Sequence, residues 1–419
     1  MVTGSAASAG RARERQLVDI LNRYADKSPR RVLGITASLA GIDAALLDII
    51  GAGASTQISL LRFRRAGYAA KMREALAHAT SAECPGLDLC RLNFALGHLL
   101  ADAAREVTRG SGGTLGDVDL IGCSGLTLYH LSRPDVDSEL EPPGAILQIG
   151  ELAVVAEQTG VTTVGDFGAT DIAAGGCGSP LMPFADFVLF HHPAKTRAVQ
   201  TIDRMASVTL VPAGDDPERV VAFDTGPGHA VVDAITKIIS EGKLLCDRDG
   251  RLASLGQVNP ELLAHMMSHA FLQRRPPKRA SGLDFGSDFI TGILDAAQRH
   301  DLTVEDLLAT VTAFTAESIA RSYRDFLAPE HDIDELILGG SGSYNAALRR
   351  MLKSRLPGLP IYLHEDFGIY GEAKDAVGYA ILANQTMLGR ASNLPRATGA
   401  AHSRPLGKII PAAAAVEPR

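Results

Sequence analysis

The sequence predicts an α/β protein made of two lobes that repeat one pattern of strands and helices. Two observations carry this prediction. Short apolar β runs alternate with stretches whose apolar residues recur three or four positions apart, as they do in amphipathic helices. The same order of runs then returns in the second half of the chain. Two matched halves in 419 residues fit the usual size of two domains, each with its own core.

The first half opens with a predicted meander of three strands joined by glycine-containing turns. Two helices follow, and then two further strands flank one more helix. The strands are expected at 31–36, 41–49, 57–63, 118–123 and 161–166, and the helices at 69–79, 92–108 and 151–159. This order describes a β-rich segment followed by a βαβ unit.

The second half repeats this order. Strands are expected at 201–211, 219–224, 335–340 and 361–364, and helices at 229–240, 303–326, 344–356 and 372–388. Residues 245–300 are rich in glycine, proline and charge and are interpreted as an insertion. The predicted domains are therefore an N-terminal α/β lobe at 31–195 and a C-terminal α/β lobe at 196–391. A tail with a short helix is expected at 1–30, and a second tail at 392–419.

Composition and charge restrict the possible partners. The net charge is −7, from 41 basic and 48 acidic residues, and no basic stripe is present, which argues against binding to nucleic acid. The five cysteines are scattered without a CxxC pair, which indicates a reducing compartment. No apolar run approaches the length of a membrane span. We therefore expect a cytoplasmic protein that binds a small-molecule substrate, without nucleic-acid or membrane partners.

The strongest local motif spans residues 222–229, where a predicted strand ends in Asp224 and a Gly-Pro-Gly turn leads into a helix. In α/β sheets ligands bind at the carboxyl ends of strands, and glycines allow backbone N–H groups to approach a phosphate or sugar. Asp224 is therefore a candidate functional residue. The alternative is that Asp224 or Thr225 only caps the following helix.

A second motif of this kind spans residues 166–181 and carries Asp166 and Asp171 around a glycine-rich loop. Paired carboxylates can bind Mg²⁺ or act as acid and base, since hard cations prefer oxygen ligands. The alternative is an aspartate that caps a helix, beside a loop whose glycines merely permit tight turns. The residues alone leave both possibilities open.

Other features give weaker signals. A glycine loop at 338–345 follows a predicted strand and would suit a nucleotide, but strand-to-helix turns are often glycine-rich for other reasons. Cys177 has no recognisable histidine partner and is interpreted as an inert small residue. His191, His192 and His229 are interpreted as structural histidines rather than ligands.

Together these motifs resemble the anhydro-N-acetylmuramic acid kinases, and still more closely the fungal levoglucosan kinases, from about residue 31 to residue 389. The matching pieces are Gly41-Ile-Asp43, residues 148–151, Asp166-Phe with Asp171 and Gly-Ser-Pro-Leu181, His191-His-Pro, Phe223-Asp-Thr-Gly-Pro-Gly228, Gly339-Gly340 with Tyr344-Asn345, and Glu372-Ala-Lys. The resemblance implies a duplicated actin-like ATPase fold of the ribonuclease H-like type, in which ATP and sugar meet in a central cleft. It also implies a homodimer.

The resemblance implies a role for each matching residue. Asp224 would be the catalytic base that activates water to open a 1,6-anhydro bridge, while the sugar oxygen takes the γ-phosphate of ATP. The substrate would be bound by Gln148, Glu151, Asp166, Asp171, Pro180 and His229. The nucleotide would be bound by Ser38, Thr225, Gly226, Gly228, Gly339, Gly340 and Asn345, and a metal by Asp43.

The sequence also departs from this family at positions that would approach phosphate. The family's first phosphate loop is two residues shorter here and has Ala40 in place of an aspartate. A glycine pair of the second lobe is replaced by Asp203 and Arg204. In addition, Gly168 replaces an arginine of the family, and His229 replaces an asparagine. Because phosphoryl transfer depends on positioning and charge stabilisation, these losses are expected to weaken binding of ATP and Mg²⁺.

These losses favour a repurposed family member, a cleft enzyme that uses Asp224 as base or acid on a small oxygen-rich or cyclic substrate without ATP. No cofactor is then required. One alternative is an ATP- and Mg²⁺-dependent kinase of a 1,6-anhydrosugar, either levoglucosan or anhydro-N-acetylmuramic acid, in which Asp203 or Asp43 replaces the lost groups. The other alternative is a non-catalytic pseudokinase that acts as a binding or scaffold protein.

Overall fold

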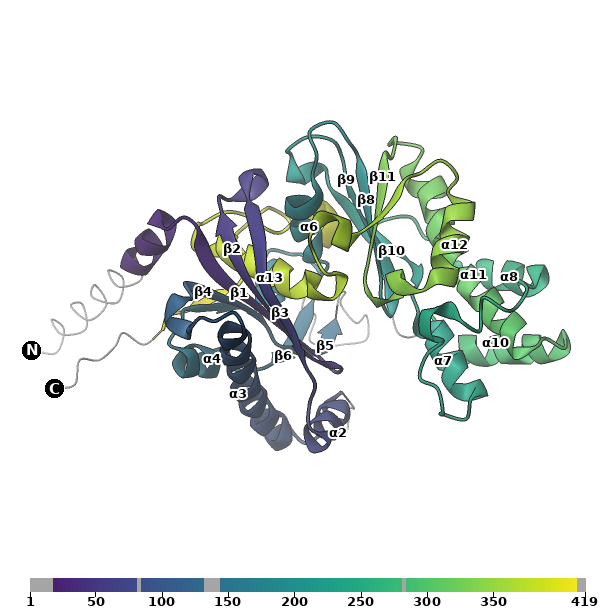
Figure 1. Cartoon of the computed structure of the whole chain (residues 1–419), viewed down its shortest axis with the longest axis horizontal. Coiled ribbons are helices and arrows are strands. Elements are labelled where there is room, and N and C mark those ends of the chain that lie inside the picture. The colour runs from purple at the N-terminus through teal and green to yellow at the C-terminus, as the bar shows by residue number, and fades with distance from the viewer. Residues whose placement is uncertain (1–17, 81–83, 132–143, 281–283, 413–419) are drawn as a thin grey trace, which may run out of the picture. The chain divides into compact units, whose positions relative to one another are not determined.

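The computed structural model describes residues 18–80, 84–131, 144–280 and 284–412. The chain divides into two compact units, Met1–Val188 with Ala373–Arg419, and Leu189–Glu372. Each unit is organised around its own mixed sheet (Figure 1). Among the described residues, no helix has the length and hydropathy needed to cross a membrane.

The first unit contains a six-stranded sheet in the order β13-β7-β4-β1-β2-β3. Its first three strands form the predicted antiparallel meander, and β4 and β7 continue the sheet parallel to β1. The strands are β1 (Arg30–Ser38), β2 (Gly41–Ile50), β3 (Gln57–Ala66), β4 (Leu120–Ser124), β7 (Thr163–Gly165) and β13 (Lys408–Ile410). A separate hairpin consists of β5 (Leu126–Leu131) and β6 (Ala145–Ile149).

Side chains that alternate along β1 build two different faces of this sheet. Leu33 and Ile35 belong to the core that also contains Leu96 of helix α3 (Gly86–Gly110). Gly34 lies between them and faces the other way, and it pairs with Gly122 of β4. A Cβ at Gly34 would lie 1.7 Å from the Ala376 carbonyl oxygen, so these glycines let helix α13 (Lys374–Met387) rest directly on the sheet.

The remaining helices of the first unit are short. They are α2 (Ala70–Ala79), α4 (Leu152–Thr159), α5 (Phe167–Ala173), α6 (Met182–Phe190), which ends where the second unit begins, and α14 (Pro395–Thr398). Residues 18–26 are also helical, as predicted for the N-terminal segment. The Tyr24 hydroxyl donates a hydrogen bond to Asn384 Oδ1 at 2.8 Å, so this segment is attached to α13.

The second unit repeats the order of the first sheet. Its five strands run β10-β9-β8-β11-β12, with an antiparallel β8-β9-β10 meander and with β11 and β12 parallel to β8. They are β8 (Arg197–Ile202), β9 (Met205–Val211), β10 (Val221–Pro227), β11 (Glu335–Gly339) and β12 (Ile361–Leu363). The predicted duplicated α/β fold, of the actin-like and ribonuclease H-like type, is therefore confirmed.

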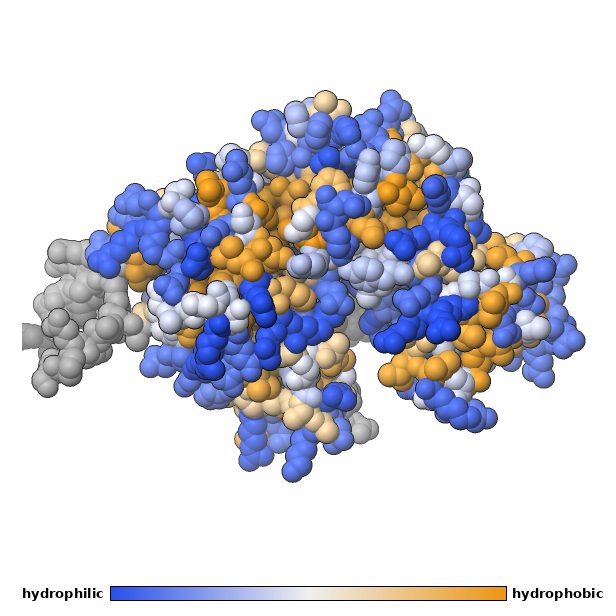
Figure 2. Space-filling model, viewed as in Figure 1, coloured by the Kyte–Doolittle hydropathy of each residue, from blue (hydrophilic) through white to orange (hydrophobic). Residues whose placement is uncertain are grey.

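Helices surround the second sheet and form a further core beside it. The central helix is α11 (Val304–Ser322), which packs on β10, on α12 (Ala346–Arg355) and on α7 (Ala230–Ile239). The predicted insertion forms α8 (Pro260–Met267), α9 (Ala270–Gln273) and α10 (Ser287–Arg299), whose apolar faces share one core with α7 and α11 (Figure 1). Apolar residues also reach the surface near α7 (Figure 2), where Leu245 is 73% exposed.

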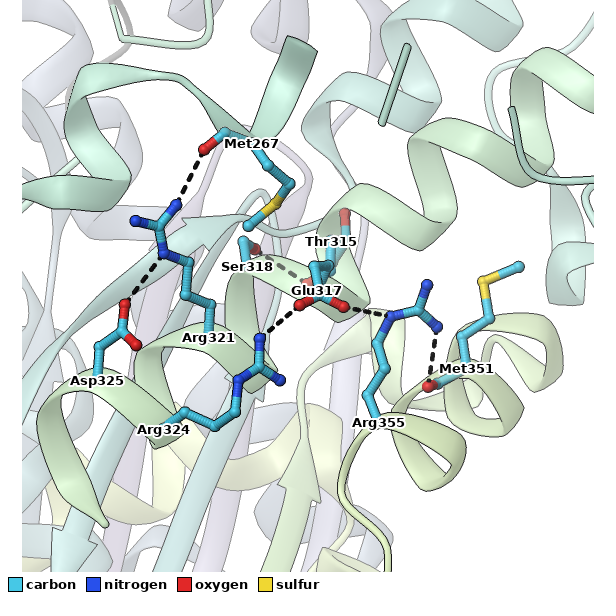
Figure 3. Close-up of polar contacts among 9 residues, drawn as sticks. All are labelled: Met267, Thr315, Glu317, Ser318, Arg321, Arg324, Asp325, Met351 and Arg355. Atoms are coloured by element: carbon cyan, nitrogen blue, oxygen red, sulfur yellow. Dashed lines mark hydrogen bonds and ion pairs between the residues drawn. The ribbon is translucent and has the colours of Figure 1, made fainter. Parts of the chain in front are cut away.

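A polar cluster on α11 fixes the neighbouring segments (Figure 3). Glu317 accepts hydrogen bonds from Arg324, in the turn that follows α11, and from Arg355 at the end of α12, at 2.6 and 2.8 Å. Arg321 pairs with Asp325 at 3.0 Å and donates to the Met267 carbonyl of α8. One helix therefore holds three neighbouring segments by side-chain contacts.

The domain boundaries differ from the prediction near the C-terminus. Helix α13 joins the first unit rather than the second, because the glycine-lined surface of β1 and β4 receives it. The segment predicted as a tail from residue 392 contains α14, and its strand β13 pairs with β7 as an edge of the first sheet. The backbone of β13 forms hydrogen bonds by pairing at the edge of the sheet. The hydrophobic pattern of this segment is too weak to predict that strand from the sequence.

Candidate active site

Asp224 is the fourth of the seven residues of β10, beside a bulge in the pairing with β9, so this strand continues past the residue at which it was predicted to end. Its side chain is buried, with the residue 5% exposed. A strap formed by residues 278–280 of the insertion crosses it. The Asp224 N–H donates to the Lys278 carbonyl at 3.0 Å, Oδ2 accepts from the Ala280 N–H at 2.8 Å, and Arg279 lies 3.7 Å from Oδ1. Asp224 therefore caps no helix, and the capping alternative is wrong for this residue.

Electrostatics at Asp224 are a balance of opposing effects. Burial raises the pKa of the Asp224 carboxyl above its ordinary value, whereas Arg279, the Ala280 N–H and Lys278 act in the opposite direction. The net shift is upward. A carboxylate with a raised pKa next to a cation is a better proton acceptor than an ordinary surface aspartate, and such groups mark functional sites.

Lys278 is itself an unusual buried cation, only 4% exposed. Its ammonium group lies 4.6 Å from the ring centroid of Phe326, 4.9 Å from that of Phe271 and 6.0 Å from that of Phe223. It also donates to the Leu272 carbonyl at 3.4 Å. Burial lowers the pKa of Lys278 to about 8, with Arg321 adding to this effect.

A chain of side-chain hydrogen bonds lies at the same end of the sheet. Asp203, in the turn between β8 and β9, accepts from both the N–H and the hydroxyl of Ser341 at 2.9 Å. The Ser341 hydroxyl also lies 3.0 Å from His229 Nε2, and His229 Nδ1 lies 2.7 Å from Asp233 Oδ2. Three turns of the sheet are thus joined through polar groups.

This chain borders a pocket of about 500 Å³ within the second unit. Its walls come from the start of α7, the loop before α8, helix α11 and the turn between β11 and α12. The lining includes Gly228, His229, Asp233, Asp247, Arg248, Asp249, Thr315, Ser341, Gly342, Tyr344, Asn345 and Glu372. Such a pocket has the size of a small-molecule site.

Among the residues predicted to bind a nucleotide, Gly228 and Asn345 line this pocket. The Asn345 side chain accepts the Leu348 N–H at 3.0 Å and therefore caps α12. Thr225 is fully buried and receives a hydrogen bond from Gln200 at 3.2 Å. Gly226 pairs with Ala206 of β9 directly after the β10 bulge, which lies between Asp224 and Gly226. Nucleotide binding by these residues stays a prediction.

The glycines of this region have a packing role that the sequence does not reveal. A Cβ at Gly228 would lie 1.7 Å from the Asp203 carbonyl oxygen, and one at Gly339 would lie 2.1 Å from the His364 ring. Gly340 has a φ of +79°, and its Cβ would lie 2.6 Å from the Ile202 carbonyl oxygen. These glycines allow the turns of the sheet to pack against one another.

The residues predicted to bind substrate, apart from His229, lie in the first unit. Asp171 is fully buried, and its carboxylate accepts from the Gly178 N–H, from Asn393 and from Thr398 at 2.8 to 3.0 Å. It therefore ties the glycine-rich loop to the C-terminal segment. A substrate could reach it only by displacing these partners.

The other predicted substrate residues also have partners within the protein. Asp166 pairs with Lys408 at 2.9 Å and has a left-handed φ of 56°. Glu151 caps α4 by accepting the Ala153 N–H at 3.1 Å. Gln148 donates to Thr127 at 2.9 Å, and Pro180 follows the glycine-rich loop before α6. Their roles toward a substrate stay predictions.

The predicted metal ligand Asp43 lies on β2 and forms a bidentate ion pair with Arg65 of β3, at 2.7 and 2.8 Å. Within the described ranges, no group of three or more histidine, cysteine or acidic side chains is arranged to hold a metal ion. Ser38 lies in the β1–β2 turn, where its hydroxyl donates to the Gly41 carbonyl at 3.3 Å. Two of the predicted ligand residues are thus engaged in local structure.

The sequence analysis missed Lys278, Arg279, Ser341 and Asp233. The first two belong to the insertion, whose sequence gives no strand or helix signal at this point. Ser341 lies in the predicted glycine loop, so its position at the end of a strand was predicted, but its hydrogen bonds were not. Asp233 lies four residues after His229 on α7, which is a spacing at which helical side chains meet.

The paired meanders with parallel extensions, the buried Asp224 on β10 and the pocket in the second unit define a class of protein. It is an actin-like α/β protein with a pocket of small-molecule size. The family model described as anhydro-N-acetylmuramic acid kinase matches residues 30–412. The chain belongs to this family.

Relatives named anhydro-N-acetylmuramic acid kinase match nearly the whole chain. The protein of Caldanaerobacter subterraneus subsp. tengcongensis is 40% identical over 395 residues, which cover 94% of this chain and 100% of that protein. That of Bacillus cereus strain ZK / E33L is 40% identical over 375 residues, covering 89% and 96%. These relatives support the kinase alternative. They support neither the ATP-independent nor the pseudokinase interpretation, nor a closer likeness to fungal levoglucosan kinases.

Solved structures are more distant. A ROK family glucokinase from Streptomyces griseus in complex with glucose and AMPPNP aligns with 85% of this chain and 99% of its own, at 14% identity and a TM-score of 0.38. A likeness at this level supports no further conclusion.

Proposed function

We propose that this protein is an ATP- and Mg²⁺-dependent kinase that phosphorylates a 1,6-anhydro sugar and hydrolyses its anhydro bridge, with anhydro-N-acetylmuramic acid as the first candidate substrate. The observation that carries the proposal is the 40% identity to a kinase of that name over the whole length of the relative. The position of Asp224, buried beside a bulge of β10 with a raised pKa, supports it.

Asp224 would act as the general base. Its carboxylate takes a proton from water, and the water oxygen forms a bond to the anomeric carbon as the anhydro C–O bond breaks. The oxygen released from the bridge takes the terminal phosphoryl group of ATP, and ADP leaves. The strap at 278–280 prepares Asp224 for this step, because the Ala280 N–H and Arg279 stabilise the ionised carboxylate in a buried place.

The residues present fit the nucleoside part of ATP. The pocket in the second unit offers carboxylates that can accept hydrogen bonds from ribose hydroxyls, and its volume suits a ligand of this size. Mg²⁺ in kinases is commonly bound through one or two carboxylates together with substrate phosphates, so a complete protein cage is not required. When bound, ATP with Mg²⁺ supplies the phosphoryl group and the charge that stabilises its transfer.

The test is a transfer assay with purified protein. Anhydro-N-acetylmuramic acid and levoglucosan are incubated separately with ATP and Mg²⁺, and the sugar product is identified by mass spectrometry. We expect a product that has gained one phosphate and one water, formed only when ATP is present. Hydrolysis of the bridge without ATP would overturn the proposal in favour of ATP-independent chemistry, and no turnover of either sugar would also count against it.

Asp224→Asn tests the base. The substitution keeps the shape of the side chain but removes its proton affinity, so we expect turnover to fall by about 10² to 10⁴-fold. Asp332→Asn is the matched control, since Asp332 is exposed and does not line the pocket. In the unchanged protein, the rate should fall on the acid side at a pH above that of an ordinary aspartate, whose pKa is near 3.9.

A further inference from the structure

The border of the pocket contains the donors that a bound anion would use. Ser341 follows Gly340 in a strand-to-helix turn, and its N–H and hydroxyl both point to one place at the end of the sheet. Turns of this kind, with exposed backbone N–H groups, are common binding sites for phosphate. A nucleotide whose base and ribose occupy the pocket would direct its phosphates to such donors.

In this protein the carboxylate of Asp203 already accepts hydrogen bonds from those donors. Asp203 Oδ1 accepts from both the Ser341 N–H and the Ser341 hydroxyl at 2.9 Å. The Asp203 backbone carbonyl also accepts the N–H of His229, the residue that precedes α7, at 2.8 Å. The side chain of Asp203 therefore occupies the donors of Ser341, and its backbone carbonyl occupies the N–H of His229. Without these contacts, the donors at two turns would face an anion.

The charges around the pocket also oppose the binding of an anion. Its lining includes Asp233, Asp247, Asp249 and Glu372, against a single arginine, Arg248. Asp247 is already satisfied by the N–H groups of residues 252 and 253 at 2.9 Å. A phosphate chain that enters here meets an excess of negative charge, whereas an uncharged nucleoside does not.

We propose that Asp203 is a specificity-determining residue that weakens the binding of nucleotide phosphates to this pocket while leaving the binding of the nucleoside part unaffected. The carboxylate competes with a phosphate oxygen for the Ser341 donors and repels the phosphate by charge. This inference rests on the proposed function, because it takes the pocket in the second unit as the nucleotide site.

Two substitutions separate competition from charge. Asp203→Asn retains an oxygen that can accept from Ser341 but removes the negative charge. Asp203→Gly removes the competing group and frees the Ser341 N–H, while the Ser341 hydroxyl keeps its contact with His229 Nε2. Asp332→Asn removes the same charge from an exposed position outside the pocket lining and is the control. None of these changes alters Asp224 or its strap.

The experiment is calorimetric titration of the full-length protein and the three variants with adenosine, ADP and ATP, each in the presence of Mg²⁺. We expect Asp203→Asn to bind ADP and ATP about threefold more tightly, since it removes one exposed charge, and Asp203→Gly about fivefold more tightly, since it also removes the competing acceptor. Adenosine affinity should stay within about twofold, and Asp332→Asn should change none of the three. The gain should shrink at high salt, because the groups are exposed.

The outcomes distinguish this inference from the proposed function. Unchanged ATP affinity in both Asp203 variants, with adenosine bound normally, would overturn the role of Asp203 and leave the kinase proposal standing. An equal gain for adenosine and ATP would also overturn it, since the effect would then not concern phosphate. If none of the proteins binds adenosine, ADP or ATP, the nucleotide pocket itself is refuted. A variant that fails to fold is replaced in the comparison by the other one.

Discussion

Replacing Lys278 with methionine should make the protein more stable at neutral pH, although it removes a charge from an aromatic cage. The ammonium group of Lys278 is buried among three phenylalanine rings and donates a hydrogen bond to the Leu272 carbonyl. Methionine has a similar length and makes favourable contacts with aromatic rings. A buried charge replaced by a well-packed apolar side chain commonly leaves stability unchanged or increases it.

The magnitude follows from the shift in pKa. Burial lowers the pKa of Lys278 from 10.5 to about 8, and each unit corresponds to about 1.4 kcal/mol, so burial of the charged form costs about 3 kcal/mol at pH 7. Cation–π attraction to the rings offsets part of this cost, at about 0.5 to 2 kcal/mol in total. The expected gain for Lys278→Met at pH 7 therefore lies at about 1 to 3 kcal/mol.

The sign of the pH dependence gives the sharper test. Between pH 8 and 10.5 an unfolded lysine holds its proton while the folded one has lost it, so the unfolded state binds more protons and stability rises with pH. The advantage of Lys278→Met over the unchanged protein should shrink by about 2 kcal/mol from pH 7 to pH 9.5.

The assay is urea unfolding at pH 7, 8, 9 and 9.5, with both proteins measured side by side so that other titrating groups cancel. Lys237→Met, at an exposed lysine of α7, is the control and should follow the unchanged protein at every pH. Parallel curves for Lys278→Met and the unchanged protein would refute the reasoning, as would a loss of more than about 1 kcal/mol at pH 7.

Two further predictions concern stability measured by urea unfolding. Asp171→Asn should cost about 2 kcal/mol, because an amide group would face donors that now meet a carboxylate; an unchanged midpoint would show that the three hydrogen bonds contribute little. Glu317→Ala should cost about 1 kcal/mol by releasing Arg324 and Arg355 at a partly exposed site, and a loss no larger than that of Asp325→Ala would contradict a special role for this cluster.

The order of elements was predictable because it depends on local pattern. Short apolar runs and glycine turns predicted the first meander, and the repeat of the pattern predicted the duplication. The second meander was predicted only in part, because residues 201–211 were expected as one strand, whereas β8 ends at Ile202 and β9 begins at Met205. The attachment of α13 to the first unit was not predictable in the same way. It depends on Gly34 and Gly122 being neighbours in register, and a sequence does not show which residues of two strands lie side by side.

In the candidate site, too, local features were predictable and contacts between distant segments were not. Asp224 was predicted from a local motif, an apolar run that leads into a Gly-Pro-Gly turn, although the strand extends beyond it to Pro227. Its partners were not, since Lys278 and Ala280 come from an insertion more than fifty residues away along the chain. Asp171 was a candidate from its paired-carboxylate motif and from the family resemblance. Its hydrogen-bond partners Asn393 and Thr398 were not predicted, because they belong to a segment that was predicted to be a tail.

The structure also explains how the replacement of a glycine pair by Asp203 and Arg204 can be compatible with a nucleotide pocket. The close approach in this region is made by Gly228 against the Asp203 carbonyl, which is a backbone group and is present whatever side chain residue 203 carries. The side chain of Asp203 points instead to Ser341 at the border of the pocket. A change at position 203 therefore alters the charge that a phosphate meets without collapsing the turns that form the walls. Under the proposed function, the departure from a phosphate motif at this position is expected to change the affinity for charge without removing the site.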